Sequence, residues 1–340
     1  MSAVKGRTVL LTKNKEQMKT RILLLVLIPL ISLSTWAEKK EYTGEYNLVY
    51  EYDTQTSTAV LKSGAEAEGA ITIASQITVE GKNYKVVKIG NDAFYNNAFI
   101  DNKKITEVVV SEGIIEIGRV AFSGCSGLRS VVLPESLVSL GMQGAFSGCS
   151  SLEAIEIPSR VKTISRFAFH NCSNLKSVVL HSGLEKLQEG AFEECTSLTS
   201  IKIPQSVIDI ATTGINNAAG VFESCTALEE IVVEKGNTVY DSRNNCNAII
   251  KTETNELITG CKTTIIPDDV TSLARLSFRG LGITEIEIPS SVKKIGESAF
   301  SNCNQLKYIV IPEGVESLEG GCFYCCKSFL QNFFLCKFFL

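Results

Sequence analysis

Apolar and polar positions along this chain follow a pattern that repeats about every 23 residues. Each unit reads P-x-x-V-x-x-I-x-x-x-A-F-x-x-C-x-x-L-x-x-I-x-I, and its phenylalanine is the clearest position for alignment. The aligned positions are Phe94, Phe122, Phe146, Phe169, Phe192, Phe222, Phe278, Phe300 and Phe323. Their spacings are 28, 24, 23, 23, 30, 56, 22 and 23 residues, so eight or nine units recur with three insertions. A period of this length predicts a solenoid, in which no unit closes a core alone.

Two kinds of element are predicted within each unit. Segments such as LRSVVLP, LEAIEIP and LKYIVIP are short, alternating and rich in β-branched residues, so each is expected to be a strand. Stacked one repeat apart, these strands form a parallel sheet on one side, and proline ends most of them. Segments such as SRFAFHNC are too short for an ordinary helix, and we expect a single helical turn that places the phenylalanine in the core. The side chains expected to face inward include Leu128, Val131, Leu133, Leu152, Ile155 and Ile157.

The recurring unit I-x-x-x-A-F-x-x-C-x-x-L-x-x-I-x-I-P resembles the BspA-like leucine-rich repeat of bacterial and protozoan surface proteins. The resemblance covers residues 86 to about 330 and rests on a motif that recurs at fixed spacing. It implies a repeat solenoid that is mainly β with short helical turns, namely a right-handed leucine-rich repeat with a parallel sheet on one face. It also implies export to the cell surface, where some members are adhesins that bind host matrix proteins or other cells.

A cysteine lies three residues after the phenylalanine in most units. One such position per coil forms a line inside the solenoid, and buried packing, disulfides and metal binding are all open interpretations. Disulfides between adjacent coils are not excluded, since bridging needs Cα atoms closer than roughly 7 Å. Packing is favoured, because Leu281 fills the same position after Phe278 and neither bridges nor ligates. The cysteines of this core ladder are Cys125, Cys149, Cys172, Cys195, Cys225, Cys303 and Cys326.

Three segments depart from the repeat. Residues 234–266 interrupt it with two strand-like runs around KTETNE, which predict a β-hairpin bulging from one coil, and similar inserts occur among BspA-like proteins. Cys246 and Cys261, near the ends of this hairpin, are either bridged across the strands or two separate buried thiols. Residues 38–85 are expected to form a β-rich cap over the N-terminal edge of the sheet. Residues 331–340 form an apolar tail that we interpret as a truncated repeat.

The first 37 residues differ from the rest in composition. A basic stretch, an apolar run from Ile22 to Leu33, and small residues up to Ala37 follow one another. This order predicts a signal peptide over residues 1–37, in which residues 1–17 precede a complete signal that starts at Met18. A membrane anchor is the alternative, but the run is shorter than the roughly 20 residues that span a bilayer. We therefore expect a protein that is exported to the cell surface, the medium or the periplasm, with no transmembrane span after signal removal.

Charge and titratable residues narrow the function. The chain carries a formal net charge of −4, but its first 37 residues hold six Lys/Arg and one Glu, so the remaining chain carries −9. This balance argues against nucleic acid as a partner, because nucleic-acid binding requires a basic patch. The two histidines, His170 and His181, accompany no zinc spacing, phosphate loop or nucleophile motif. The CFYCC stretch from Cys322 to Cys326 lacks the second ligand pair of a zinc site. The sequence predicts no enzyme, no metal and no cofactor.

The outward side chains of the predicted strands form the candidate binding surface. Solenoids present extended surfaces, and here the sheet mixes charged residues with a stripe of exposed valines. We expect this surface to bind a protein partner, such as a host matrix protein or another cell-surface protein. Two alternatives are open: a non-catalytic scaffold of the cell envelope, in which the valines only support their strands, and an exported enzyme, which the missing site disfavours. The residues assigned to the surface are Glu107, Val109, Val132, Glu156, Val179, Lys202, Val232, Glu287, Tyr308 and Val310.

Overall fold

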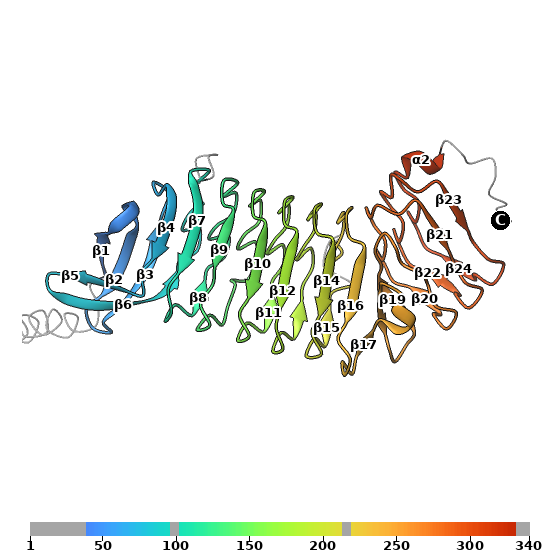
Figure 1. Cartoon of the computed structure of the whole chain (residues 1–340), viewed down its shortest axis with the longest axis horizontal. Coiled ribbons are helices and arrows are strands. Elements are labelled where there is room, and N and C mark those ends of the chain that lie inside the picture. Colours follow the sequence, from blue (N-terminus) through green and yellow to red (C-terminus); the bar gives the residue numbers. More distant parts are fainter. Residues whose placement is uncertain (1–38, 96–101, 213–218, 331–340) are drawn as a thin grey trace, which may run out of the picture.

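The chain folds into an elongated row of coils, as the computed structural model in Figure 1 shows. Residues 39–95, 102–212 and 219–330 are described. Strands make up nearly all of the regular structure, and α2 (Lys327–Leu330) is the only α-helix within these ranges. Successive coils lie side by side, which confirms the predicted repeat solenoid. The predicted signal peptide at 1–37 and the apolar tail at 331–340 lie outside the described residues.

One side of the row consists of parallel strands formed by the alternating segments. Val131 and Ile155 are buried while their sequence neighbours are exposed, because successive side chains of a strand point to opposite faces. Strands one coil apart pair in register, with Ile155 opposite Val178 for example. Hydrogen bonds join β4, β7, β9, β10 and β12 in that order into one sheet, and they also pair β14 with β16 and β21 with β23. We call the outward side of these strands the strand face; it comprises β4 (Gly69–Ile73), β7 (Ile105–Val110), β9 (Ser130–Val132), β10 (Ala154–Ile157), β12 (Ser177–Leu180), β14 (Ser200–Ile203), β16 (Glu230–Val233), β21 (Glu285–Glu287) and β23 (Tyr308–Val310).

A second, shorter ladder follows another side of the row and was not predicted from the sequence. In most coils the segment that corresponds to V-x-x-I contains a two-residue strand, and Ile164 pairs in parallel with the buried Leu187 of the next coil. Two residues per coil are too few to show the alternation that marks a strand in a sequence. We call this the second ladder; it comprises β8 (Glu116–Ile117), β11 (Thr163–Ile164), β13 (Lys186–Leu187), β15 (Asp209–Ile210), β20 (Ser272–Leu273), β22 (Lys294–Ile295) and β24 (Ser317–Leu318).

The A-F-x-x-C segments form a ladder of turns, which corrects the expected helical turn. Residues on both sides of the Ala-Phe pair have positive φ, as at Phe167 (55°) and Asn171 (56°), and this interrupts a right-handed helix. The backbone N–H of Cys172 donates to the carbonyl of Phe169 at 3.2 Å within the coil. The N–H of Phe169 instead donates to the carbonyl of Ala191 in the next coil at 2.9 Å. The turns therefore connect neighbouring coils, whereas a helix would use these N–H groups internally.

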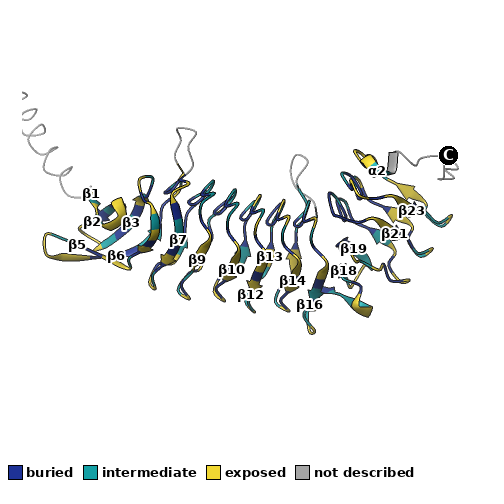
Figure 2. Cartoon of the chain, turned by 45° about the horizontal axis from the view of Figure 1, so that its top comes forward, coloured by how far each residue is buried: buried dark blue, intermediate teal, exposed yellow. Residues whose placement is uncertain are grey.

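The core contains a row of stacked phenylalanine rings surrounded by aliphatic side chains. Buried residues follow the coils along the length of the row (Figure 2). Consecutive rings from Phe94 to Phe222 have centroids 4.6 to 5.6 Å apart, with planes within 14° of parallel. The rings from Phe278 to Phe323 stack in the same way. Each ring is covered on both sides only if both neighbouring coils are present, so stability comes from contacts between coils.

Residues 39–89 precede the first complete repeat and cover the N-terminal end of the core. β1, β2 and β3 are antiparallel, and β3 pairs in parallel with β6, which continues through β8 into the second ladder. The sequence-based boundary at residue 85 therefore falls inside β6. The outer strand β1 is exposed, and its Glu41 forms an ion pair with Lys62; charges at an edge discourage pairing with another sheet. The elements are β1 (Lys39–Thr43), the 3₁₀ turn η1 (Glu45–Asn47), β2 (Val49–Asp53), β3 (Thr58–Ser63), β5 (Gln76–Val79) and β6 (Lys82–Ile89).

The segment at 234–266 contains a hairpin, but the hairpin does not bulge from the row as expected. β18 and β19 are antiparallel, and β19 pairs in parallel with β20 of the second ladder. The hairpin is therefore built into the solenoid. Cys246 and Cys261 are two separate buried thiols. The elements are β17 (Tyr240–Asp241), the 3₁₀ turn η2 (Arg243–Asn245), β18 (Ile249–Lys251) and β19 (Glu256–Thr259).

Candidate interaction surface

The structure places the predicted surface residues together on the strand face. Nine of the ten are exposed, and Val232 is half-buried. The most exposed apolar members are Val132, at 57 %, and Tyr308, at 55 %. Val109 and Val179 are exposed at 42 % and 43 %, so apolar side chains recur along the row of strands. Apolar residues in such a row are more than the scattered exposure expected of any protein surface.

Within the valine stripe, Glu156 and Lys202 are paired with side chains from the next coil. Oε1 of Glu156 lies 2.7 Å from Nε2 of His181, and Nζ of Lys202 lies 2.7 Å from Oε1 of Glu234. His181 and Glu234 both occupy the position at which a proline such as Pro158 ends a neighbouring strand. The hydrogen bond from Lys202 lowers the pKa of Glu234. Exposed pairs of this kind contribute at most about 1 kcal/mol, so the main effect of the Lys202–Glu234 pair is to balance charge on the strand face.

The two ends of the strand face differ in chemistry. From β9 to β14 the column beside the valines contains only small side chains, such as Ser130 and Ala154, which makes this part of the face flat. β21 instead presents two exposed carboxylates, Glu285 and Glu287. On β23, the strand that pairs with β21, Tyr308 lies opposite Glu285. A partner would therefore meet a flat, valine-rich surface on one part and an acidic, aromatic surface on the other.

A groove beside β16 was not predicted from the sequence. Its volume is about 620 Å³, and its lining is largely polar, with Lys202, Glu230, Asn245 and Asn247 among the side chains. The hydroxyl of Ser242, which follows β17, accepts a hydrogen bond from the N–H of Val233 at 3.0 Å, so the insert covers part of the outer edge of β16. The groove depends on how the insert folds against β16, and the repeat pattern carries no signal for that arrangement.

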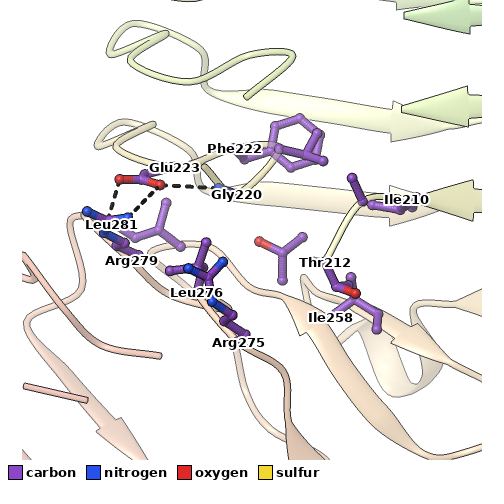
Figure 3. A pocket seen from close by; sticks show the side chains of 13 residues that line it. Ile210, Thr212, Gly220, Phe222, Glu223, Ile258, Arg275, Leu276, Arg279 and Leu281 are labelled. Carbon is purple, nitrogen blue, oxygen red and sulfur yellow. Dashed lines mark hydrogen bonds and ion pairs between the residues drawn. The ribbon is translucent and has the colours of Figure 1, made fainter. Parts of the chain in front are cut away.

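A small cavity lies where β15 and the turn after Gly220 meet the insert and the following coil (Figure 3). Its space of about 10 Å³ accommodates about one water molecule. Oε1 of Glu223 lies 3.1 Å from Nε of Arg279 at its rim, and Glu223 also accepts a hydrogen bond from the N–H of Gly220. Burial raises the pKa of Glu223, while Arg279 opposes that effect. A cavity of this size with a paired charge offers no room for a substrate.

The cysteines of the predicted core ladder are all buried and free of disulfides. The sequence indicates their apolar character, but it does not reveal the contact between the thiol and a backbone carbonyl that recurs along the line. Burial raises the pKa of the Cys172 thiol well above its usual range, which makes it a poor nucleophile. The one hint in the sequence is that cysteine recurs at this position where alanine or valine would also fit, which points to a small side chain that can donate a hydrogen bond. The Sγ atoms lie 2.9 to 3.2 Å from the carbonyl oxygen of the preceding coil's phenylalanine at Cys149, Cys172, Cys195, Cys225, Cys303 and Cys326.

Several carboxylates gather on the turn side of the row, near Phe192. Nε2 of His170 lies 3.7 Å from Oε2 of Glu193. Burial, followed by repulsion from Glu223 and Glu194, raises the pKa of Glu193 to about 7. Across the described ranges, no group of three or more His, Cys, Asp or Glu side chains is placed to hold a metal ion. Glu193 therefore has a raised pKa, in a cluster that lacks the geometry of a metal site.

Comparison with known families gives one clear match. The family described as "BspA type Leucine rich repeat region" matches residues 88–219 and 258–337, in six copies, which is more than half of the chain. No curated protein matches the sequence. Among residues 39–95, 102–212 and 219–330, no helix has the length and apolar character needed to cross a membrane.

Solved structures with the same architecture come from bacteria. A leucine-rich cell surface protein from Faecalibacterium prausnitzii is 25 % identical, with a TM-score of 0.62 over 85 % of this chain and 81 % of that one. The pneumococcal vaccine antigen PcpA is 22 % identical, with a TM-score of 0.66 over 84 % and 73 %. A leucine-rich repeat protein from Bacteroides ovatus is 24 % identical, with a TM-score of 0.50 over 86 % and 69 %. At these identities the last two comparisons support the fold alone.

Proposed function

The chain belongs to the BspA-type leucine-rich repeat family, and on that premise we propose that it is an exported, non-catalytic protein that binds a protein partner through its strand face. The observation that carries this proposal is the row of exposed apolar side chains along the strands, from Val109 to Val310. Solenoids present long surfaces out of proportion to any pocket, and a protein partner fits such a surface better than a small substrate does.

Two further observations support a protein partner. Between β7 and β16 the valine stripe contains two charged side chains, Glu156 and Lys202, and each is held by a side chain of the next coil, so the stripe suits apolar contact. The strands each offer only one or two outward side chains, so affinity should be spread over several coils. The cell-surface description of the relative from Faecalibacterium prausnitzii agrees with an exported location.

The proposal is tested with a charged triple variant, Val132→Glu, Val179→Glu and Tyr308→Glu, on the strand face. Immobilised wild-type and variant proteins are compared for capture of a panel of purified extracellular-matrix proteins and of intact bacterial cells. We expect the variant to lose most of the capture, because three desolvated contacts become charged. Circular dichroism of both proteins establishes that the fold is retained.

A matched control exists beside the second ladder. Ile115, Val138 and Ile208 are exposed at 48 %, 43 % and 52 %, close to the exposure of the three test residues. Their triple change to Glu should leave capture unaltered. If both triple variants capture the same partners equally well, the strand face is not the binding site. If the wild-type protein captures none of the probes, the scaffold function gains support.

A further inference from the structure

The insert repeats the architecture of the N-terminal segment. At the N-terminus, β1, β2 and β3 are antiparallel, β3 pairs in parallel with β6, and β6 pairs in parallel with β8. In the insert, β17, β18 and β19 are antiparallel, β19 pairs in parallel with β20, and β20 pairs in parallel with β22. A 3₁₀ turn lies between the first two strands in both, at η1 and η2. The two segments thus share strand order and strand direction.

The two hairpins also share an irregularity. In the N-terminal hairpin, Val49 is opposite Ser63 and Tyr50 is opposite Leu61, so one residue is skipped. In the insert, Ile249 is opposite Thr259 and Ile250 is opposite Leu257, with the same skip. A β-bulge bends its strand and increases the local twist, so a bulge at the same position gives both hairpins the same shape.

Each hairpin is followed by a glycine that covers the first ring of a phenylalanine stack. The N–H of Gly64 donates to the carbonyl of Ala93 at 2.7 Å, and the N–H of Gly260 donates to that of Ser277 at 2.9 Å. A Cβ atom on Gly64 would lie 2.0 Å from the ring of Phe94, and one on Gly260 would lie 2.2 Å from the ring of Phe278. Backbone covers the ring face in both places, where a preceding coil would otherwise supply a phenylalanine.

The phenylalanine stack and the strand face are interrupted at the insert, although the turns remain linked by the N–H of Ser224, which donates to the carbonyl of Arg279 at 3.2 Å. Among the described rings, no stacked pair joins Phe222 to Phe278, and the described strands β16 and β21 do not pair. Side chains supply much of the polar contact across the junction: the N–H of Ile210 donates to the hydroxyl of Tyr240 at 3.0 Å, and Glu223 pairs with Arg279. The family match is interrupted over the same region and resumes at residue 258.

We propose that residues 237–262 are an internal cap, so that the chain is two capped solenoids in series. The first block extends from β1 to β16 and the second from β17 to β24. In a repeat protein the interfaces between neighbouring units determine how far unfolding propagates, so a junction without ring stacking and strand pairing separates two cooperative units. The strand face is consequently two surfaces, the flat valine-rich surface of the first block and the acidic surface of β21 and β23.

Native-state hydrogen exchange of the whole chain, followed by mass spectrometry in increasing urea, tests this directly. In the wild-type protein we expect peptides of the two blocks to open at two different urea concentrations. Gly260→Ala, which forces a Cβ against Phe278, should speed exchange in residues 270–326 by about tenfold or more while residues 102–212 change less than about twofold. Gly64→Ala should do the opposite and speed exchange in residues 102–212 more than in residues 270–326, because its Cβ meets Phe94 in the first block.

Gly320→Ala is the matched control, since a Cβ there meets nothing within 4 Å. It should leave exchange in both blocks unchanged. The proposal is wrong if wild-type peptides from both blocks open together at one urea concentration, or if Gly64→Ala and Gly260→Ala each speed exchange equally throughout the chain. The wild-type measurement decides the question even if a glycine variant fails to fold.

Discussion

The ladder of turns and the strand face are built from the same coils, but the turns repeat the same residues from coil to coil, whereas the outward residues of the strand face differ. In the turns nearly every coil supplies the same residues: Phe169 stacks on the corresponding ring of the neighbouring coil, and Sγ of Cys172 lies 3.2 Å from the carbonyl oxygen of Phe146. On the strand face the same outward position is Val179 in one coil and Lys202 in the next. A side chain that must pack on its own copy is constrained to one size and chemistry. A side chain that faces outward is constrained only by its strand.

The largest effect is expected where a ring is removed from the middle of the stack. Phe169 lies between Phe146 and Phe192, with centroids 5.6 and 5.4 Å away, and is fully buried. Phe169→Ala should lower the free energy of unfolding by about 3 to 5 kcal/mol, because it leaves a cavity that two flanking rings cannot fill. Urea denaturation measures this. Val179→Ala on the strand face of the same coil is the control, and an equal loss there would remove the distinction between the two regions.

This contrast explains which parts of the fold the sequence predicts. The phenylalanine, cysteine and leucine positions recur because each is buried in the core between neighbouring coils, so their period predicts the solenoid, its strands and its core. The second ladder has two residues per coil, as at Ile164, which is too short for any periodicity. The sequence does not distinguish these turns from helical turns, because positive φ is adopted by different residues in each coil, including Phe167 and Asn171, which have no common sequence signal.

The candidate site is predictable only in part, for the same reason. Alternation within a strand identifies which residues point outward, so the exposed positions of Val132 and Tyr308 follow from the sequence. Contacts between outward residues of different coils, such as Glu156 with His181, depend on the register of pairing. The groove beside β16 depends on how the insert folds. Leu61 and Leu257 occupy the same place beside the bulges of their hairpins, and this follows only from the pairing of the strands.

The next largest effect on the free energy of unfolding is expected at Glu193, a turn residue that lies close to other carboxylates and whose counterparts in most other coils differ from it. The pKa of Glu193 is raised from 4.5 to about 7, so the folded state binds this proton more tightly than the unfolded state does. The proton therefore stabilises the fold fully below pH 4.5, and that stabilisation is lost as the pH rises towards about 7. Glu193→Gln should raise the free energy of unfolding at pH 8 by on the order of 1 to 2 kcal/mol, and by little at pH 4.

Urea denaturation from pH 4 to pH 8 measures this difference. His170, Glu194, Glu223 and Arg279 also face or influence this carboxyl group, so the measurement is repeated with His170→Gln. Glu153→Gln is the control, because its carboxylate is exposed and paired with Lys176. Equal stability of Glu193→Gln and wild type at every pH would show that this carboxylate is not strained by its neighbours.

A smaller effect is expected from the thiol beside the ring. Sγ of Cys172 lies 3.2 Å from the carbonyl oxygen of Phe146. Cys172→Ala should cost about 1 kcal/mol through a small cavity and a lost donor. Cys172→Ser keeps a donor of nearly the same size, so it should retain the hydrogen bond and separate this contribution from packing. Because burial raises the pKa of this thiol, alkylation should be slow in the native protein and complete in denaturant. Rapid labelling of Cys172 in the native protein would contradict both the burial of this thiol and its raised pKa.

The smallest effect on stability is expected at Val132, and its neighbour provides the sharpest control. Val131 is 8 % exposed and Val132 is 57 % exposed, although they are adjacent on β9. Threonine keeps the β-branched shape, so Val132→Thr should change the free energy of unfolding by less than about 0.5 kcal/mol, whereas Val131→Thr buries a hydroxyl and should cost about 1 to 3 kcal/mol. In the capture assay the order should reverse, with Val132→Thr weakening partner binding and Val131→Thr leaving it intact at temperatures where both fold. If Val131→Thr weakens capture as much as Val132→Thr does, outward position on β9 has no bearing on recognition.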